Sequence, residues 1–359
     1  MSEAPLRADL QPLPELPELE RRWRALEQGC GGAPSFFLSW DWIGPWLAAT
    51  GARPRLFSVT QGARDVALAL VGQGARRTKF GAVPMLLLNE AGEEEADRAF
   101  IEYNGLLTGP SDAAASAALL IETLMQDRRW RTLRIAGVAG DSPLLTQPGF
   151  ARATRYDASP AYYVDLGAVR AKGDYLDLLS SNTRGQVRKS LRDRGGDAAI
   201  VRAGAADVAP WLAEMQRLNV GRHADNAWDR PVFRAFADAL VRQGLDSGCT
   251  DLLRIAIGGQ HVGYLLNILH DGRAMNYQSA FVDPAGGKDK PGLMSHAAAV
   301  AHYAARDLSR YSFLAGKDRY KQSLSTDAEA LEWWWLDRRS LRLSAEHRLR
   351  ALLKRPASA

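Results

Sequence analysis

Glycines and lysines concentrate in the segment Phe281–Leu293, between a predicted strand (273–282) and a predicted helix that begins at Pro291 or Gly292. These residues are Gly286, Gly287, Lys288, Lys290 and Gly292, with Leu293 following them. Proline suits a first helical turn because its missing N–H would lack a partner there. The free N–H groups that follow, with the lysines beside them, could bind an anion such as a phosphorylated cofactor. A plain glycine-rich connection with solvated lysines explains the same spacing, and neither a P-loop nor a Rossmann fingerprint is present.

A second polar group follows the predicted strand Arg310–Leu314. After Gly316 come Lys317, Arg319, Tyr320 and Lys321, which could bind an anion or handle a proton. We expect this strand exit to lie beside the helix start just described. The alternative is that Gly316 permits a tight turn and Tyr320 packs on the sheet edge.

A basic stripe occupies a third segment, where Ser181 or Asn182 can cap a predicted helix. Arg184, Arg188 and Arg192 follow at helical spacing and share one face. Guanidinium groups placed in this way suit bidentate binding of phosphate or carboxylate. A solvated charged face explains the stripe as well.

Cysteine and histidine usage excludes several kinds of site. Cys30 and Cys249 are the two cysteines, so no disulfide framework, CxxC pair or cysteine-based zinc site can form. His296 and His302 are six residues apart on one predicted helix and point to different faces. No HExxH motif, nucleophile elbow or carboxylate cluster is present, so we expect no metal.

The composition is that of an ordinary globular protein. The chain has 359 residues, 46% of them apolar and 24% charged, with a net charge of +5. This length favours roughly two domains, and the mild charge permits an anionic ligand without implying DNA. No run of about 18 apolar residues predicts a membrane span. The start lacks signal-peptide features, and two isolated thiols fit a reducing compartment, so we expect a cytoplasmic protein.

An internal repeat organises the chain. Two predicted hairpins, 55–71 and 251–269, are each followed by an Ala-rich helix (111–129 and 291–307) and then a strand. This pattern favours a duplicated α+β domain over chance similarity. We therefore expect an irregular and helical segment at 1–34, domains at 35–160 and 161–340, and a basic amphipathic helix at 341–359.

The order of these elements resembles a known family. The hairpin, the strand entering Lys290-Pro-Gly-Leu293, the helix, the strand and then Gly316–Lys321 are similar to the GNAT acetyltransferase domain of CelD-like (cellulose-biosynthesis-associated) proteins. Those proteins are related to FemAB-type aminoacyl transferases, which carry two tandem GNAT-like domains. Phe36–Trp46 and Asn182–Leu191 also resemble family segments, and the match spans about 35–337.

The resemblance implies a fold, a reaction and a co-substrate. The fold is a pair of tandem GNAT-like domains, each a mixed, mostly antiparallel sheet flanked by helices. The reaction moves an acyl group from acetyl-CoA or another acyl-CoA to an amine or hydroxyl of a small-molecule or saccharide acceptor. The pyrophosphate would lie over 286–292, where Lys288, Gly292 and the following backbone replace the usual glycine run. The first domain has no comparable loop between Phe80 and Pro110, so we expect it to have lost cofactor binding.

The resemblance also implies roles for single residues. Backbone N–H groups of the splayed central strand would polarise the thioester. Tyr277 and Tyr320 are candidate acids, Asp283 is a candidate base, and Lys321 matches the Tyr-Lys pair of the family. The candidate acceptor-binding residues are Arg184, Arg188, Arg192 and Lys317.

Two other functions remain open. A FemAB-like transferase would use aminoacyl-tRNA, and the arginine stripe would then contact RNA or a sugar-nucleotide. A non-catalytic accessory protein of polysaccharide synthesis would keep only a relic of the GNAT pocket.

Overall fold

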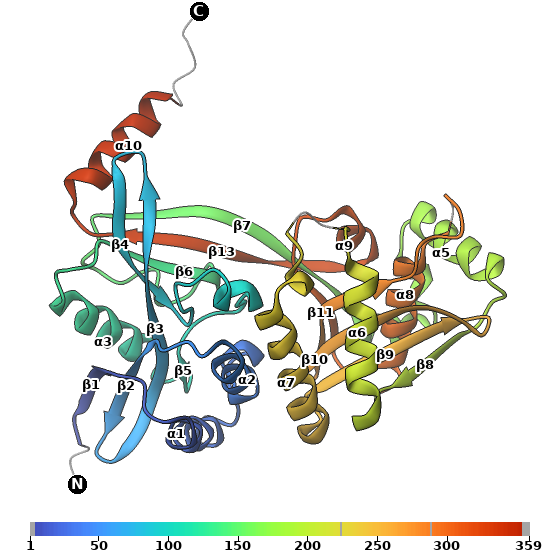
Figure 1. Ribbon diagram of the computed structural model, residues 1–359, viewed down its shortest axis with the longest axis horizontal. Coiled ribbons are helices and arrows are strands. Elements are labelled where there is room, and N and C mark those ends of the chain that lie inside the picture. Colours follow the sequence, from blue (N-terminus) through green and yellow to red (C-terminus); the bar gives the residue numbers. More distant parts are fainter. Residues whose placement is uncertain (1–3, 223–224, 288, 354–359) are drawn as a thin grey trace, which may run out of the picture. The chain divides into compact units, whose positions relative to one another are not determined.

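The computed structural model describes residues 4–222, 225–287 and 289–353, and the chain divides into two compact units (Figure 1). Unit 1 comprises Met1–Ala158 and Leu331–Ala359, and unit 2 comprises Ser159–Ala330. This division differs from the sequence-based one at its C-terminal end, where 331–340 and the last helix pack with unit 1. The reason is a long strand, β13 (Asp327–Asp337), that begins in unit 2 and ends in unit 1.

Unit 1 contains six further strands and four α-helices among its described residues. The strands are β1 (Leu6–Gln11), β2 (Arg55–Gln61), β3 (Arg64–Thr78), β4 (Gly81–Leu88), β5 (Leu107–Thr108) and β6 (Thr132–Ala139). The helices are α1 (Leu16–Gly29), α2 (Trp40–Thr50), α3 (Ala113–Gln126) and α10 (Leu341–Leu353). Strand β7 (Arg152–Asp165) begins in this unit and ends in unit 2.

Unit 2 contains the segments that carry the predicted site. Its other strands are β8 (Ala198–Arg202), β9 (Thr250–Ile257), β10 (Gln260–His270), β11 (Arg273–Phe281) and β12 (Arg310–Ala315). Its helices are α4 (Leu166–Lys172), α5 (Ser181–Asp193), α6 (Val208–Asn219), α7 (Pro231–Ser247), α8 (Pro291–Ala304) and α9 (Arg319–Leu324). A short 3₁₀ helix, η3 (Tyr175–Leu178), precedes α5.

The two units repeat one strand order. In unit 1, β2, β3 and β4 pair antiparallel and β4 pairs parallel with β6. In unit 2, β9, β10 and β11 pair antiparallel and β11 pairs parallel with β12. One helix separates the parallel strands in each case, α3 in unit 1 and α8 in unit 2. The fold is therefore α+β, and each unit repeats a GNAT-like set of mixed strands flanked by helices, as the sequence predicts, although the strands of both units belong to one continuous sheet.

The N-terminal segment departs from expectation because part of it is a strand. Residues 6–11 pair antiparallel with β2, with Leu6 opposite Gln61 and Gln11 opposite Leu56. Leu6, Ala8 and Leu10 pack against the core of unit 1 at a period of two. The neighbouring prolines hide this short alternation in the sequence.

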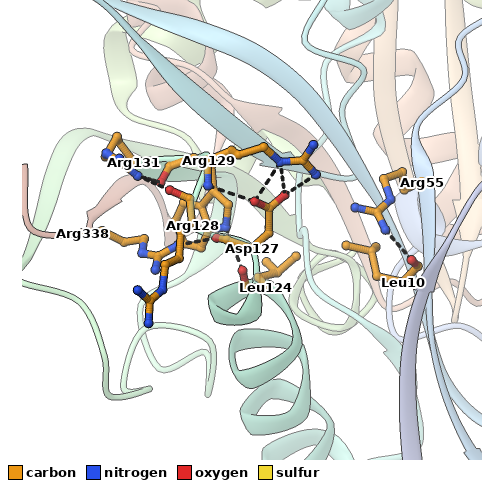
Figure 2. Close-up of polar contacts among 9 residues, drawn as sticks. Leu10, Arg55, Leu124, Asp127, Arg128, Arg129, Arg131 and Arg338 are labelled. Atoms are coloured by element: carbon orange, nitrogen blue, oxygen red, sulfur yellow. Dashed lines mark hydrogen bonds and ion pairs between the residues drawn. The ribbon is translucent and has the colours of Figure 1, made fainter.

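Basic residues cap the C-terminus of α3 (Figure 2). Arg338, just beyond β13, donates to the backbone carbonyl of Asp127 at 2.6 Å. Arg129 binds the Asp127 carboxylate with both its Nε and its Nη2, and this lowers the pKa of Asp127 to about 2. Cations are favourable at the negative end of a helix. This arginine cluster therefore stabilises unit 1 where β13 ends.

Helices cover both faces of the unit 2 sheet. Helix α7 packs on β9 and α6 on β11, and both cover the same face (Figure 1). Helix α8 packs on β10 and contacts α4 and α5 on the opposite face. Its buried residues, among them Met294, Val300 and Tyr303, belong to the core of this unit. The rigid core therefore fixes where α8 begins.

Candidate active site

Strands β11 and β12 diverge at the centre of unit 2. Their parallel ladder consists of three residue pairs and ends at Met275 and Ser312. Beyond this point β11 runs on to Phe281 and β12 to Ala315 without pairing with each other. We call the opening between these two strand ends the wedge. Helix α8, which follows β11, begins beside it.

A pocket of about 760 Å³ lies at the start of α8. It is formed by the N-terminal part of α5, the end of β11, the following loop, the first turn of α8, and α9. Its lining residues include Asn182, Thr183, Gln186, Arg222, Phe281, Asp289, Lys290, Gly292, Leu293, Arg319 and Tyr320. The structure thus brings the predicted loop and the predicted strand exit into one pocket.

The pocket has an excess of positive charge. Arg222, Lys290 and Arg319 line it. The carboxylate of Asp289 lines it too, but Arg194 binds this group through Nε at 2.9 Å and lowers the pKa of Asp289. The Ala285 N–H also donates to Asp289, at 2.8 Å, and so holds the loop in place. Because Arg194 neutralises Asp289 and Asp283 pairs with Arg222, the charges of Lys290 and Arg319 set the sign of the pocket.

The first turn of α8 adds backbone donors. Lys290 is the N-cap residue and Pro291 has no N–H, so the N–H groups of Gly292 and Leu293 lie at the helix start. A Cβ at Gly292 would lie 3.0 Å from Cε2 of Phe281, so glycine allows the helix to begin against this ring. Gly286 and Gly287 belong to the loop in open space, and Lys288 lies outside the described residues. The arrangement suits an anion.

Tyr320 lines the pocket and stacks on a histidine of α8. Its ring lies 5.8 Å from that of His296, with an angle of 18° between the planes. Burial raises the pKa of Tyr320 to about 12, so its hydroxyl stays protonated at neutral pH and can donate a proton. Lys321 donates from Nζ to the carbonyl of Ala315 at 2.7 Å, which ties α9 to the end of β12. Lys317 is exposed on the preceding loop.

Tyr277 does not lie in this pocket. The register of β10 and β11 shifts at a β-bulge, where Leu266 lies opposite Gln278 and Asn267 opposite Asn276, so the bulge falls at Tyr277. The ring of Tyr277 packs on α7, 6.2 Å from Phe233 and 6.3 Å from Phe236. If the side chains of β11 alternated regularly, Tyr277 would lie on the same face of the sheet as Phe281. The bulge turns Tyr277 to the opposite face, which α7 covers. The expectation that Tyr277 serves as the acid is therefore corrected.

Asp283 is also displaced from the proposed chemistry. Its side chain is 96% exposed and pairs with Arg222 at 2.8 Å. A general base must be held within hydrogen-bonding reach of the proton that it removes. Asp283 lines no part of the pocket, so its expected role as base is corrected to an ion pair at the rim.

The arginine stripe of α5 points away from the pocket. Arg188 pairs with Asp174 and Asp177, each at 3.0 Å, and Arg184 lies 3.6 Å from Asp177. Arg192 is exposed. Asn182 and Gln186 of α5, which line the pocket, each stand two positions from Arg184, which is more than half a helical turn. The stripe therefore forms a paired, solvated face, and its expected acceptor role is corrected.

Sequence reasoning missed several residues that build the site. They are Arg194, Arg222, Phe281, Asp289 and His296. A signal existed for His296, which stands four residues after Gly292 on one helical face. None existed for Arg222 or for the pair Arg194–Asp289, because each meets the loop only through the tertiary fold.

The equivalent wedge in unit 1 is closed by the chain itself. Strands β4 and β6 also share three parallel pairs, ending at Leu87 and Arg134. Beyond them, the Asn104 N–H donates to Gly137 O and its Nδ2 donates to Leu88 O, both at 3.0 Å. Residues of both diverging strands are thus bonded to one inserted segment.

No helix in the described part of the chain is both long enough and apolar enough to cross a bilayer. No cluster of three or more His, Cys, Asp or Glu side chains in the described ranges could hold a metal ion.

Comparisons with known proteins agree with this geometry. Residues 181–322 match the family model described as acetyltransferase (GNAT) domain. The comparison with curated proteins gave no significant match. Among solved structures, FemX is similar at a TM-score of 0.58 and 10% identity, covering 94% of this chain and 98% of FemX.

Two further structures show the same architecture. The C-terminal domain of a putative lysylphosphatidylglycerol synthetase from Agrobacterium fabrum has a TM-score of 0.57 at 10% identity, covering 94% of this chain and 98% of its own. L-PGS from Bacillus licheniformis has a TM-score of 0.53 at 11% identity, covering 94% and 97%. These likenesses concern the fold. Unit 2 thus carries a GNAT-type acetyltransferase domain, in a chain whose fold is similar to those of FemX and lysylphosphatidylglycerol synthetase.

Proposed function

We propose that this chain transfers an acyl group, in the first instance acetyl, from acyl-CoA to an amine or hydroxyl of a small-molecule acceptor. The observation that carries the proposal is the pocket that joins the start of α8, the cations Lys290 and Arg319 and a protonated tyrosine, Tyr320. The match to the GNAT family model, residues 181–322, includes all the pocket-lining residues named above. Both observations support a donor site in unit 2.

The residues present fit the anionic part of acyl-CoA. The N–H groups of Gly292 and Leu293 would bind the pyrophosphate, and Arg222, Lys290 and Arg319 would offset the negative charge of the phosphates. The pocket volume of about 760 Å³ lies within the usual range for ligand sites. Beyond Met275 and Ser312, β11 and β12 no longer pair with each other. Backbone N–H groups there could polarise the thioester carbonyl.

The reaction is a direct displacement. The lone pair of the acceptor amine attacks the thioester carbonyl carbon, and the C–S bond breaks after the C–N bond forms. Tyr320 is the acid that we assign, because its raised pKa keeps the proton on the hydroxyl until the thiolate leaves. The proton released by the acceptor nitrogen then restores the tyrosine, so no net proton is left on the enzyme.

We infer that unit 1 keeps the fold without binding acyl-CoA. Asn104 bonds to Leu88 and Gly137 across its wedge, so opening it would break both hydrogen bonds. Binding there would therefore carry a penalty that binding to unit 2 does not. One acyl-CoA per chain is the expected stoichiometry.

Replacing Arg319 by Ala should weaken acetyl-CoA binding roughly 10- to 100-fold. A hydrogen bond to a charged group contributes about 1.5–3 kcal/mol, and Arg319 lines the pocket. Isothermal titration calorimetry on the full chain measures the change. Arg188→Ala is the matched control, because this arginine pairs with Asp174 and Asp177 outside the pocket. Equal affinity for both variants would contradict the assignment of the phosphate site.

Replacing Tyr320 by Phe should lower kcat by roughly 10²- to 10⁴-fold, which is the usual contribution of a positioned acid. The affinity for acetyl-CoA should stay within about twofold, since the ring and its stacking on His296 remain. Release of free CoA with a panel of amines and amino sugars provides the assay. Tyr277→Phe is the control, because that ring packs on α7. Full turnover in Tyr320→Phe would remove the tyrosine from the mechanism.

The acceptor and pathway remain part of the proposal. The resemblance to CelD-like proteins favours a saccharide acceptor in polysaccharide synthesis. The use of acyl-CoA and the two cysteines, Cys30 and Cys249, which form no disulfide with each other, favour a cytoplasmic location.

The fold likeness to FemX over 94% of the chain keeps the aminoacyl-tRNA alternative in view. Arg184 and Arg188, which would contact RNA, are paired with aspartates. Acetyl-CoA and an aminoacyl-tRNA offered as rival donors separate these functions, and a non-catalytic accessory protein would turn over neither.

A further inference from the structure

His296 lies beneath the wedge and is fully buried. Its ring centroid lies 5.7 Å from that of Phe281, at the end of β11, and 5.2 Å from that of Phe313, on β12 beyond the ladder. On another side it stacks on Tyr320, which lines the pocket. The imidazole is therefore enclosed by residues of both diverging strands and of the pocket wall.

One ring nitrogen of His296 has a defined partner. The hydroxyl of Tyr311 lies 2.9 Å from Nδ1, and Tyr311 is itself fully buried. Within the described residues, the hydrogen-bond contact of the Tyr311 hydroxyl is with Nδ1 of His296. The direction of this hydrogen bond depends on the tautomer of the ring, and we assign Tyr311 as the donor to Nδ1. In the neutral ring the proton then resides on Nε2.

The other ring nitrogen is unsatisfied. Nε2 of His296 is buried and has no hydrogen-bond partner within the described part of the chain. A buried N–H without an acceptor is unfavourable, and in native proteins such a group calls for a specific explanation. Burial, with a smaller contribution from the charge of Lys321, lowers the pKa of His296 to about 3. The ring thus stays neutral, as a donor rather than a base.

We propose that Nε2–H of His296 donates a hydrogen bond to the thioester group of acyl-CoA in the wedge, and that Tyr311 positions the ring for this contact. The inference rests on the proposed function and names the group in unit 2 that contacts the thioester end of acyl-CoA. It explains why a buried polar side chain stands four residues after Gly292, where an apolar residue would pack without an unpaired N–H. A hydrogen bond from this group to the thioester becomes stronger as negative charge develops on the thioester oxygen during attack.

The test is NMR on the full chain labelled with ¹⁵N-histidine. The chain has six histidines, and the spectrum of His296→Phe identifies the pair of signals that belongs to His296. Without ligand, the Nδ1 and Nε2 shifts should be those of the tautomer with the proton on Nε2. In Tyr311→Phe this preference should weaken towards a mixture, because the hydroxyl that fixes it is gone. An unchanged tautomer in that variant would overturn the role of Tyr311.

Ligand titration then tests the donor itself. Saturating acetyl-CoA should shift the Nε2 and Hε2 resonances of His296, whereas adenosine 3′,5′-bisphosphate, which lacks the thioester, should leave them unchanged. Acetyl-CoA that binds by calorimetry without moving these resonances overturns this inference and leaves the proposed function standing. Absence of any acetyl-CoA binding overturns both.

Kinetics supply a second readout. His296→Phe fills a similar volume without a donor and should lower kcat/KM about a hundredfold. The affinity for adenosine 3′,5′-bisphosphate should be unchanged, which also shows that the phosphate site is folded. A variant with unchanged kcat/KM would contradict the proposal, and Tyr311→Phe serves as the second variant if His296→Phe does not fold.

Discussion

Replacing Gly292 by Asp should abolish measurable binding of acetyl-CoA. The carboxylate would stand at the start of α8, where the N–H groups of Gly292 and Leu293 face the pocket. Like charges about 4 Å apart near a protein surface repel by roughly 4 kcal/mol, which is about a thousandfold in affinity. The new side chain would also press on the ring of Phe281, 3.0 Å from a Cβ at this position.

Calorimetric titration with acetyl-CoA measures this effect, and two further variants separate its causes. Gly292→Ala meets Phe281 without the charge and should weaken binding far less. Ala213→Asp places the same charge on an exposed position of α6 and should leave binding unchanged. Circular dichroism confirms that each variant is folded. Acetyl-CoA bound by folded Gly292→Asp with wild-type affinity would eliminate this site.

Replacing Asp337 by Ala should lower the free energy of unfolding of unit 1 by roughly 3–5 kcal/mol. Asp337 and Arg76 are buried, and Nη1 of Arg76 lies 2.9 Å from the carboxylate. Thr132 and His347 also bind this carboxylate. Without it, the Arg76 guanidinium would keep its charge in the core, 3.6 Å above the ring of Trp335, with no carboxylate partner.

Urea-induced unfolding, followed by tryptophan fluorescence, provides the measurement. Asp238→Ala, which breaks the exposed Arg242–Asp238 pair on α7, is the control and should change stability by less than about 1 kcal/mol. The double variant Arg76→Met with Asp337→Leu should recover most of the loss, because it leaves no buried charge unpaired. A stability loss below about 1 kcal/mol in Asp337→Ala would show that this ion pair does not anchor β13.

Local signals made much of the fold and part of the site predictable. The two hairpins with their glycine turns, the Ala-rich helices and the strands after them depend on neighbouring residues, and the structure contains each of them. The helix start at Pro291 could also be predicted locally, because proline is favoured in the first turn of a helix. The pocket could be predicted because Gly316–Lys321 comes directly after β12, and β12 pairs with β11, the strand that precedes this helix start.

The features that could not be predicted depend on contacts between residues that are far apart in the sequence. The bulge in β11 that turns Tyr277 towards α7 is set by pairing with β10, and nothing near Tyr277 marks it. Whether the arginine stripe faces the pocket depends on the rotation of α5, and Asp174 and Asp177 determine it. The passage of β13 from unit 2 into unit 1 likewise requires a pairing with β6, remote in the sequence. Helical and strand periodicity specify faces, but not what those faces meet.

The central claim is that acyl-CoA binds in unit 2 at the start of α8 and that unit 1 binds none. Hydrogen–deuterium exchange with mass spectrometry, with and without acetyl-CoA, tests it directly on the full chain. We expect slower exchange in peptides covering 281–297 and 316–324, and unchanged exchange in peptides covering 85–110, where the chain fills its own wedge. Protection in 85–110, or exchange in 281–297 that saturating acetyl-CoA leaves unaltered, would contradict the claim.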